Sequence, residues 1–324
     1  MRATRAIVRQ LGGPEAIEWE EVAIGDPGPG EVLVAHEAVG LNYIDVYHRS
    51  GIYPMDLPGA LGLEAAGRVV AAGPGSPWRE GDRVATFGPH RGAYSTARLV
   101  AGDSLLPIPD SISSDVAAAV LLKGCTTEFL VERCGRVEAG WDVLVHAAAG
   151  GVGTLLCQWL KAVGARVIGT VSTAEKSALA RAAGADEVIL YVQEEVGPRV
   201  RDLTGGKGVR VTFDGVGKDT WEASVTSTGR RGLIAGYGNA SAPVGNVNLG
   251  SLATAGSLFV TRPTLFDYYT TPEERRTGVE RLWAMIASGA VKPEIGARYP
   301  LTDAGTAHRD LESRRTTGSV LLLP

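Results

Sequence analysis

The chain has 324 residues, of which 44% are apolar and 21% charged, and 32 basic against 36 acidic side chains leave a formal net charge of −4. At roughly 100 to 200 residues per domain, this length predicts two globular domains with cores of their own. The acidic balance excludes a diffuse positive field that would hold nucleic acid or an anionic membrane. Three cysteines without a CxxC pair exclude a disulfide framework and a four-cysteine zinc site.

The sequence shows neither a secretion signal nor a membrane span. Residues 1–10 alternate charged and apolar side chains and lack the apolar run of about 7 to 15 residues that a signal peptide needs. Two charge-free stretches, residues 143–160 and 232–261, are interrupted by glycine turns or polar residues, which argues against spans of about 20 residues. We therefore predict a cytoplasmic protein.

Residues 1–120 show short strand patterns separated by glycine and proline turns such as Gly73-Pro74-Gly75. The predicted strands lie at residues 6–10, 17–22, 31–41, 64–72, 82–87 and 94–100. This pattern predicts an antiparallel, barrel-type module.

After Pro109 the pattern changes to helices that alternate with strands. Helices are predicted at residues 111–133, 151–163, 174–183, 196–203 and 220–227, and strands at 143–146, 166–171, 187–190, 209–213 and 232–235. Such alternation predicts a doubly wound parallel sheet of the Rossmann type. The tail, with helices near 273–288 and 304–312 and a strand at 319–323, is expected to rejoin the first module. The predicted domains are therefore 1–120 with 263–324, and 121–262 inserted between them.

The strongest chemical signal is a glycine turn at residues 143–153, where Val-Leu-Val-His-Ala-Ala-Ala-Gly-Gly-Val-Gly leads from a strand into a helix. Glycine lets backbone amides approach a pyrophosphate, and the helix directs unpaired N–H groups and the positive end of its dipole at the charge. A second strand follows about 20 residues on, a spacing that favours a dinucleotide site over a purely structural turn.

The end of that second strand indicates which dinucleotide binds. NAD enzymes usually carry an acidic residue there for the ribose 2′-hydroxyl, whereas this chain has Thr170-Val171-Ser172, followed by Lys176. A hydroxyl and a cation can bind a 2′-phosphate, so the residues favour NADPH over NADH. Taken alone, Lys176 is equally a solvated lysine in a first helical turn, and Ser172 is equally a helix cap.

With these motifs in place, the chain resembles the zinc-free NADPH:quinone oxidoreductases, the zeta-crystallin-like group of the medium-chain dehydrogenase/reductase superfamily. The segments that carry the resemblance run through the whole chain: residues 12–15, 40–45, 49–54, 62–67, 81–84, 146–153, 260–263 and 311–314. The resemblance implies that the first module is a GroES-like catalytic domain.

The resemblance also bears on metal and flavin. Zinc alcohol dehydrogenases of this superfamily place a cysteine where this chain has Asn42 and a histidine where it has Leu63. The five histidines show no ligand spacing of their own. We therefore expect NADPH to be the cofactor, with neither metal nor flavin.

By resemblance, a set of polar residues is assigned to the site. Asn42, Tyr47 and Tyr53 correspond to the family's residues around the nicotinamide and the substrate, with Tyr53 and Asn42 as donors to the developing oxyanion. The cofactor would be bound by Asn42, Gly150, Gly151, Val152, Ser172, Lys176, Tyr191, Gly238, Asn239 and Arg314.

Simpler interpretations of several of these residues stay open. Tyr47 and Tyr53 could pack their rings with the hydroxyl at the rim, as most tyrosines do. Tyr191 could stack on adenine or only end the sheet. Arg314, beside Arg315, could be a solvated helix end. Asp45 is expected to orient its neighbours.

The predicted activity is the NADPH-dependent reduction of quinones or similar electron-poor carbonyl compounds. The first alternative is reduction of the C=C bond of enals, enones or enoyl thioesters, which related zinc-free enzymes perform. The alternative of another class is a crystallin-like or RNA-binding protein, against which the acidic charge and the intact glycine turn argue. Residues 256–261 read as an apolar strand at a sheet edge, which predicts a twofold dimer.

Overall fold

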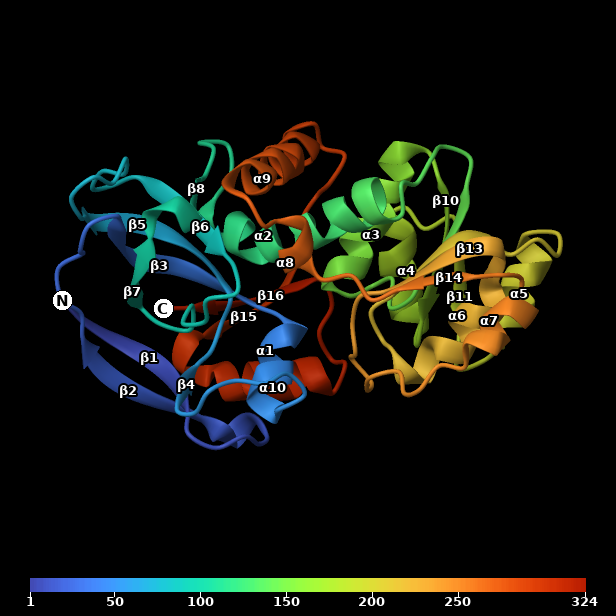
Figure 1. Ribbon diagram of the computed structural model, residues 1–324, viewed down its shortest axis with the longest axis horizontal. Coiled ribbons are helices and arrows are strands. Elements are labelled where there is room, and N and C mark those ends of the chain that lie inside the picture. Colours follow the sequence, from blue (N-terminus) through green and yellow to red (C-terminus); the bar gives the residue numbers. More distant parts are fainter. The chain divides into compact units, whose positions relative to one another are not determined.

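The computed structural model describes residues 1–324. The chain divides into two compact units (Figure 1): the first comprises Met1–Lys123, Thr270–Trp283 and Pro293–Pro324, and the second Gly124–Tyr269 and Ala284–Lys292. The first unit is an antiparallel module and the second a parallel α/β sheet, as the sequence predicts.

The division assigns residues 263–269 and 284–292 to the second unit, whereas the sequence-based bounds placed them in the first. Hydrogen bonds account for this difference. The Tyr269 hydroxyl donates to the Cys125 carbonyl at 3.3 Å and to Glu128 at 2.7 Å, and the Lys292 amide donates to the Gln158 side chain. The bounds 1–120 with 263–324, and 121–262, remain a prediction beside this division.

The first unit contains two sheets. One has the strand order β2-β1-β4, and the other has the order β15-β16-β3-β5-β6-β8, with β7 also paired to β3. All of these pairs are antiparallel except β15 with β16. The strands are β1 (Arg2–Val8), β2 (Ile17–Ala23), β3 (Glu31–Leu41), β4 (Gly59–Ala60), β5 (Glu64–Ala72), β6 (Arg83–Phe87), β7 (Ala97–Ala101), β8 (Leu105–Pro107), β15 (Ile295–Pro300) and β16 (Ser319–Leu323).

Two helices and three short 3-10 turns also belong to this module. The helices are α1 (Tyr43–Ser50) and α10 (Ala304–Glu312), with short 3-10 turns η1 (Pro14–Ala16), η2 (Gly102–Ser104) and η5 (Leu301–Asp303). One core cluster joins strands from both sheets to α10, through residues such as Val8, Val39, Leu322 and Ala307. The tail therefore completes the core of the module in which the chain begins.

The second unit is built on a six-stranded parallel sheet in the order β11-β10-β9-β12-β13-β14. The strands are β9 (Asp142–Val145), β10 (Arg166–Val171), β11 (Glu187–Leu190), β12 (Val209–Asp214), β13 (Thr228–Gly236) and β14 (Phe259–Thr261). The helices between them are α3 (Gly151–Val163), α4 (Ala174–Ala182), α5 (Val196–Leu203), η4 (Lys218–Thr220), α6 (Trp221–Ser227) and α7 (Leu249–Thr254). This arrangement is the predicted doubly wound sheet.

The remaining helices lie near the junctions of the chain between the units. They are α2 (Ser114–Glu128), the π-helix η3 (Phe129–Cys134), α8 (Leu265–Tyr268) and α9 (Pro272–Ala287). The helix predicted at residues 111–133 therefore begins at Ser114 and changes to π-helical bonding at Phe129. No helix is both long and apolar enough to cross a membrane.

The strand predicted at residues 94–100 is shorter than expected, since β7 begins only at Ala97. Residues 92–94 instead donate backbone hydrogen bonds to Leu61 and Gly62. Tyr94 therefore belongs to a buried turn, and its ring is fully covered. Alternating side chains alone do not distinguish such a turn from the strand that follows it.

Candidate active site

The glycine turn lies between β9 and α3, as its motif predicts. Gly150 is the N-cap of α3, and the Thr154 amide makes the first helical bond, to the Gly150 carbonyl at 2.9 Å. The amides of residues 151–153 therefore have no acceptor within the helix. Gly153 must be glycine, since a Cβ there would lie 2.2 Å from the Ala147 carbonyl oxygen. No acidic residue lies in the first turn of α3, so the turn can receive an anion.

The other predicted cofactor residues follow the ends of the neighbouring strands. Parallel pairing aligns Val145 with Gly169 of β10 and with Phe213 of β12, and Asp214 with Gly236 of β13. The carboxyl ends of these strands therefore share one edge of the sheet. From β9 the chain runs to β10 and β11 on one side, and it then crosses to β12 on the other side of β9, so the glycine turn lies at the topological switch point.

Ser172 and Lys176 lie at this edge, beyond β10. Ser172 directly follows the strand and is partly exposed. Thr173, not Ser172, is the N-cap of α4, and its hydroxyl accepts the Lys176 amide at 3.2 Å. The side chain of Ser172 is thereby left out of the cap, which leaves it available to a ligand.

Tyr191 and the pair Gly238 and Asn239 follow two further strands at the same edge. Tyr191 comes directly after β11 with 40% of its surface exposed. A Cβ at Gly238 would lie 2.3 Å from the Gly215 carbonyl oxygen, so the loops after β12 and β13 touch there.

Asp214, the last residue of β12, holds the loop after that strand in place. Its buried carboxylate accepts the Gly217 amide at 3.0 Å and the Ser224 hydroxyl at 2.6 Å.

In the first unit, Asn42 is held by buried charged residues. It is the N-cap of α1, is 5% exposed, and its side-chain amide donates to Glu64 at 2.7 Å. Glu64 is fully buried, accepts the Leu122 amide at 2.7 Å, and pairs with Lys123 at 3.1 Å. An amide nitrogen carries two N–H groups, so the Glu64 carboxylate fixes the Asn42 plane while the second N–H can serve a ligand.

Tyr47 and Tyr53 are brought together by α1 and the turn after it. Their ring centroids lie 5.1 Å apart at an interplanar angle of 61°, an edge-to-face pair. The Tyr53 amide donates to the Tyr47 carbonyl at 3.0 Å. Tyr47 is 5% exposed, whereas Tyr53 is half-buried. The geometry is compatible with both the packing and the donor interpretation, and it gives Tyr53 the better access to solvent.

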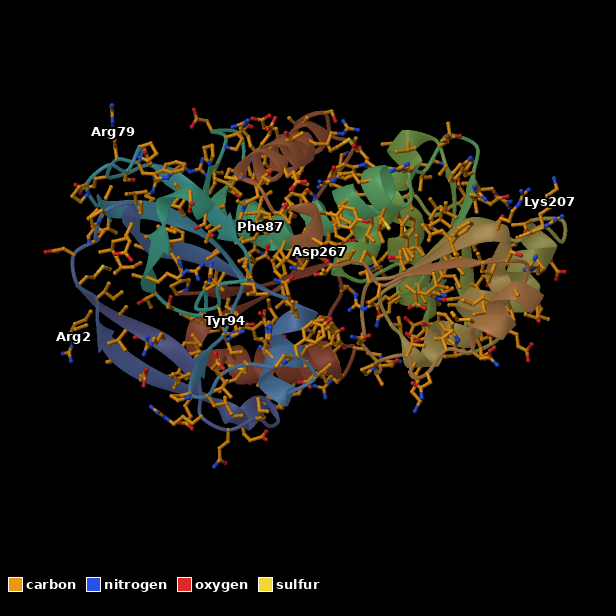
Figure 2. The ribbon with its side chains drawn as sticks, viewed as in Figure 1. Arg2, Arg79, Phe87, Tyr94, Lys207 and Asp267 are labelled. Carbon is orange, nitrogen blue, oxygen red and sulfur yellow. The ribbon has the colours of Figure 1, made fainter.

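A buried network of hydrogen bonds holds the first turn of α1. The Asp45 carboxylate accepts hydrogen bonds from the Asn42 backbone amide at 2.9 Å and from the Tyr94 hydroxyl at 3.1 Å. That hydroxyl also contacts His308 Nε2 at 3.0 Å, and His308 Nδ1 lies 3.0 Å from the Arg49 guanidinium. Tyr94 lies inside the first unit (Figure 2). Four side chains from three parts of the sequence are thus connected.

In this network each residue donates its hydrogen bond in the direction of Asp45, from Arg49 through His308 and Tyr94. A guanidinium only donates, so His308 Nδ1 must accept from Arg49, and the imidazole proton lies on Nε2 and is donated to Tyr94. Burial and the Arg49 charge lower the pKa of His308 to about 3, which keeps the ring neutral. Burial raises the pKa of Asp45 to about 7, while its hydrogen bonds from Asn42 and Tyr94 act in the opposite direction. Its Oδ1 is buried without a partner.

Arg49 also connects this buried network to Glu312, a partly exposed residue of α10. It is 1% exposed and binds Glu312 of α10 in a bidentate pair at 2.7 and 2.9 Å. Arg314 follows α10 with a positive φ of 59°. It is exposed, but its charge acts on Tyr43, whose hydroxyl donates to the Leu311 carbonyl at 3.3 Å. Arg314 therefore lies beside the start of α1.

The predicted site residues thus form two sets. Asn42, Tyr47, Tyr53 and Arg314 gather around α1 in the first unit, and the others gather at the carboxyl edge of the parallel sheet in the second. Sequence reasoning missed Glu64, Tyr94, His308 and Asp214 as supporting residues. Only Glu64 gave a signal, since a carboxylate in the otherwise apolar run at residues 63–67 predicts a buried ion pair.

The residues around Asn42 do not fit a metal ion. No group of three His, Cys, Asp or Glu side chains is placed to hold one. Leu63 is apolar and 1% exposed, and the Asn42 amide already donates to Glu64. No step of the chemistry is therefore assigned to a metal in this chain.

Comparison with known proteins first defines the class. Residues 28–110 match the alcohol dehydrogenase GroES-like domain, and residues 151–279 match the model described as zinc-binding dehydrogenase. Together with the parallel sheet and its glycine turn, these matches define a medium-chain dehydrogenase/reductase, and they confirm the predicted fold class.

Full-length relatives then identify the family. A quinone oxidoreductase of Pseudomonas aeruginosa is 49% identical over 99% of this chain and 100% of its own length, and quinone oxidoreductase 1 of Escherichia coli is 46% identical over the same shares. The crystal structure of an Escherichia coli quinone oxidoreductase complexed with NADPH matches at a TM-score of 0.97 and 46% identity, covering 99% of this chain and 100% of that one. The chain belongs to the quinone oxidoreductase family, and the predicted resemblance is confirmed.

Proposed function

We propose that this enzyme reduces quinones with NADPH. The observation that carries the proposal is the full-length match, at a TM-score of 0.97, to a quinone oxidoreductase that was crystallised with NADPH. The glycine turn before α3, at the switch point of the sheet, is the corresponding feature of this chain.

The residues of the second unit fit the parts of NADPH. The amides of Gly151 and Val152 bind the pyrophosphate at the positive end of α3. Ser172 and Lys176 bind the 2′-phosphate as hydroxyl donor and cation. The Tyr191 ring stacks against the adenine, and Gly238 and Asn239 line the path of the cofactor, where a side chain at Gly238 would collide with the neighbouring loop. Arg314 supplies a further contact to the cofactor, as the family resemblance implies.

The residues around α1 act on the acceptor. Bound NADPH supplies a hydride, and the quinone carbonyl oxygen then gains negative charge that hydrogen-bond donors stabilise. Asn42 offers its second N–H in an orientation fixed by Glu64, and Tyr53 offers its hydroxyl. Tyr47 holds the Tyr53 ring in place. A proton for the quinone oxygen comes from Tyr53, which solvent then reprotonates.

Steady-state oxidation of NADPH with benzoquinone and naphthoquinone tests the activity directly. We expect loss of the reduced nicotinamide absorbance that depends on both acceptor and enzyme, and at least a tenfold lower kcat for Tyr53→Phe. Asn42→Ala should lower kcat further than Tyr47→Phe does. If none of several quinones is reduced, the proposed activity is wrong.

Lys176→Ala tests the choice of dinucleotide. Removing the cation should weaken NADPH binding about tenfold and leave NADH binding within about twofold, since only NADPH carries the 2′-phosphate. Lys207→Ala is the matched control, because Lys207 is an exposed lysine of the same unit (Figure 2). Equal NADPH affinity in wild type and Lys176→Ala would disprove the assignment of the phosphate to Lys176.

A second candidate activity is reduction of an electron-poor C=C bond. A 2-haloacrylate reductase of Burkholderia is 39% identical over 98% of this chain and 98% of its own length. Parallel assays with 2-chloroacrylate and naphthoquinone separate the two candidates. A kcat/KM for 2-chloroacrylate above that for every quinone tested would favour the second.

We also propose a cytoplasmic homodimer. β14 is the edge of the parallel sheet, and its Phe259 and Val260 are 63% and 40% exposed, so two copies could continue the sheet through these edges. Sedimentation of the wild type should give a dimer, and Val260→Lys should give a monomer. None of the three cysteines forms a disulfide, which agrees with a reducing compartment such as the cytoplasm, and cell fractionation tests this location.

A further inference from the structure

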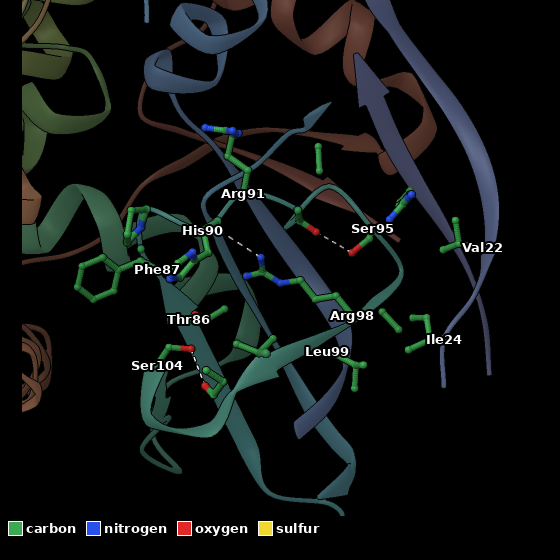
Figure 3. A pocket seen from close by; sticks show the side chains of 18 of the residues that line it. Val22, Ile24, Thr86, Phe87, His90, Arg91, Ser95, Arg98, Leu99 and Ser104 are labelled. Atoms are coloured by element: carbon green, nitrogen blue, oxygen red, sulfur yellow. Dashed lines mark hydrogen bonds between the residues drawn. The ribbon is translucent and has the colours of Figure 1, made fainter. Parts of the chain in front are cut away.

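The first unit contains a pocket whose lining includes none of the residues assigned above. Its volume is about 610 Å³, and it is bounded by the end of β2, the loop at residues 86–92 and strand β7 (Figure 3). Four arginines, Arg5, Arg91, Arg98 and Arg275, contribute to its lining together with His90, and no aspartate or glutamate does. In a chain with a net charge of −4, such a one-sided lining favours an anion.

Arg98 is the central cation of this pocket. Figure 3 shows its side chain extending from β7 across the pocket toward the loop that carries His90 and Arg91. Its only hydrogen bond is a long one of 3.4 Å to the His90 carbonyl, and its Nε is buried without a partner. Burial lowers the pKa of Arg98 to about 10, so the guanidinium is still charged at neutral pH.

Arg98 is half-buried, and partial desolvation of a cation is unfavourable unless an anion or hydrogen bonds replace the lost water. Arg49 of the same unit shows how a buried arginine is usually stabilised. Its guanidinium binds the Glu312 carboxylate with two hydrogen bonds. Arg5, at the rim of the pocket, pairs with Glu20 at 2.7 Å. Arg98 has no carboxylate within ion-pair distance, so most of its donors are available to a ligand.

Apolar side chains flank Arg98 on both sides. Figure 3 places Val22 and Ile24 of the β2 segment on one side and Phe87 on the other. Leu99 also lines the pocket, next to Arg98 on β7. A cation between apolar walls matches a ligand that has one anionic group on a small hydrophobic body, which buries its body as its charge is paired.

We propose that this pocket binds a small organic anion, a carboxylate or a phosphate monoester with an apolar body. The Arg98 guanidinium binds the anionic group, for which its planar fork of donors is suited. Val22, Ile24 and Leu99 contact the body. Arg91, which has no ion pair of its own, adds a second positive charge at the pocket.

Calorimetric titration of the full-length chain tests the site with three probes of one shape: benzoate, phenyl phosphate and the neutral benzamide. At least one of the two anions should bind ten times more tightly than benzamide. Arg98→Gln should raise the Kd of that anion at least tenfold. Arg79→Gln should leave it within twofold, because Arg79 is an exposed arginine of the same unit (Figure 2).

Comparison of the two anions shows whether the group recognised is a carboxylate or a phosphate. Benzamide that binds as tightly as both anions would overturn the proposal, as would inorganic phosphate that binds as tightly as phenyl phosphate, since the apolar walls would then contribute nothing. If the Arg98→Gln variant does not fold, the site is located instead by NMR, from the amide chemical shifts of the wild-type protein. Changes on adding benzoate or phenyl phosphate that centre on residues 22–25 and 95–101 support the site, and changes centred elsewhere overturn it.

Discussion

The two sets of candidate site residues, one in each unit, are held in place by different kinds of interaction. In the second unit the residues proposed to bind the cofactor are mostly glycines, backbone amides and residues placed just beyond strand ends, so their positions follow from the parallel sheet itself. In the first unit the groups proposed to act on the acceptor are side chains, held by buried carboxylates and by a network of four hydrogen-bonded residues next to α1.

This difference predicts different sensitivities to substitution. A backbone site fails where a new side chain collides with the main chain. A buried polar site fails where one partner of a pair is removed and the other is left charged or unpaired. The following changes test that contrast, from the largest expected effect to the smallest.

The largest effect is expected for Lys123→Met. Lys123 and Glu64 are 7% and 0% exposed and lie 3.1 Å apart, so removal of the lysine leaves a buried carboxylate without its cation. The free energy of unfolding in urea should fall by about 3–5 kcal/mol, and Glu64→Gln added to Lys123→Met should recover much of it. Glu18→Gln breaks a half-exposed pair with Arg9 and should cost less than about 1 kcal/mol. Equal losses in the two single variants would refute the contrast.

The next effect is a pH dependence from Asp45. Its folded pKa is about 7 against an ordinary 3.8, so between these values the folded state keeps a proton that the unfolded chain releases. The group therefore lowers stability as pH rises through this window. Asp45→Asn removes that loss while its amide oxygen can still accept the Asn42 and Tyr94 hydrogen bonds. From about pH 5 to about pH 8 the variant should gain about 3 kcal/mol on the wild type.

The difference between wild type and variant is the quantity to measure, because buried histidines titrate in the opposite sense. Burial lowers the pKa values of His36 and His308 to about 3 in the folded state. Because the unfolded chain takes up protons on these residues below about pH 6.5, the wild type loses stability as the pH falls below that value. These residues are common to both proteins and cancel in the difference. Curves of unfolding free energy that stay parallel across the whole range would show that Asp45 carries no such proton.

A smaller effect is expected at the glycine turn. Gly153→Ala puts a Cβ 2.2 Å from the Ala147 carbonyl oxygen, and the turn must shift to relieve that contact. The Kd for NADPH, followed by fluorescence of the bound nicotinamide, should rise about tenfold, or about 1.4 kcal/mol. Gly245→Ala is the control, since no atom lies within 4 Å of its Cβ. An unchanged Kd in Gly153→Ala would separate the turn from cofactor binding.

The smallest effect is expected at the cap of α4. Thr173→Ala removes the acceptor of the Lys176 amide and should lower the free energy of unfolding by about 1 kcal/mol. Thr173→Ser keeps the hydroxyl and should behave nearly as the wild type in the same urea titration. If both variants lose equally, the hydroxyl is not the group that stabilises the helix.

The sequence predicted the second unit well for a physical reason. Its strands and helices each carry their own periodicity, and parallel strands bring their carboxyl ends to one edge. Helix 196–203 and strand 187–190 have the predicted bounds. Local motifs predicted Gly150, Gly151 and Ser172, and the family resemblance added Tyr191 and Gly238. All five follow strands of that sheet at the same edge.

Only the tertiary structure decided the surroundings of Asn42 and the environment of Arg98. Arg49 contacts a histidine 259 positions away, and Tyr94 contacts the same histidine across 214. No periodicity encodes such pairs, because each depends on which side chains the packed core leaves without water. Burial then turns ordinary residues into special ones: it raises the pKa of Asp45 and leaves the Arg98 charge without a carboxylate. The sequence predicted the glycine turn between a strand and a helix, and only the fold determined which charged side chains would be buried.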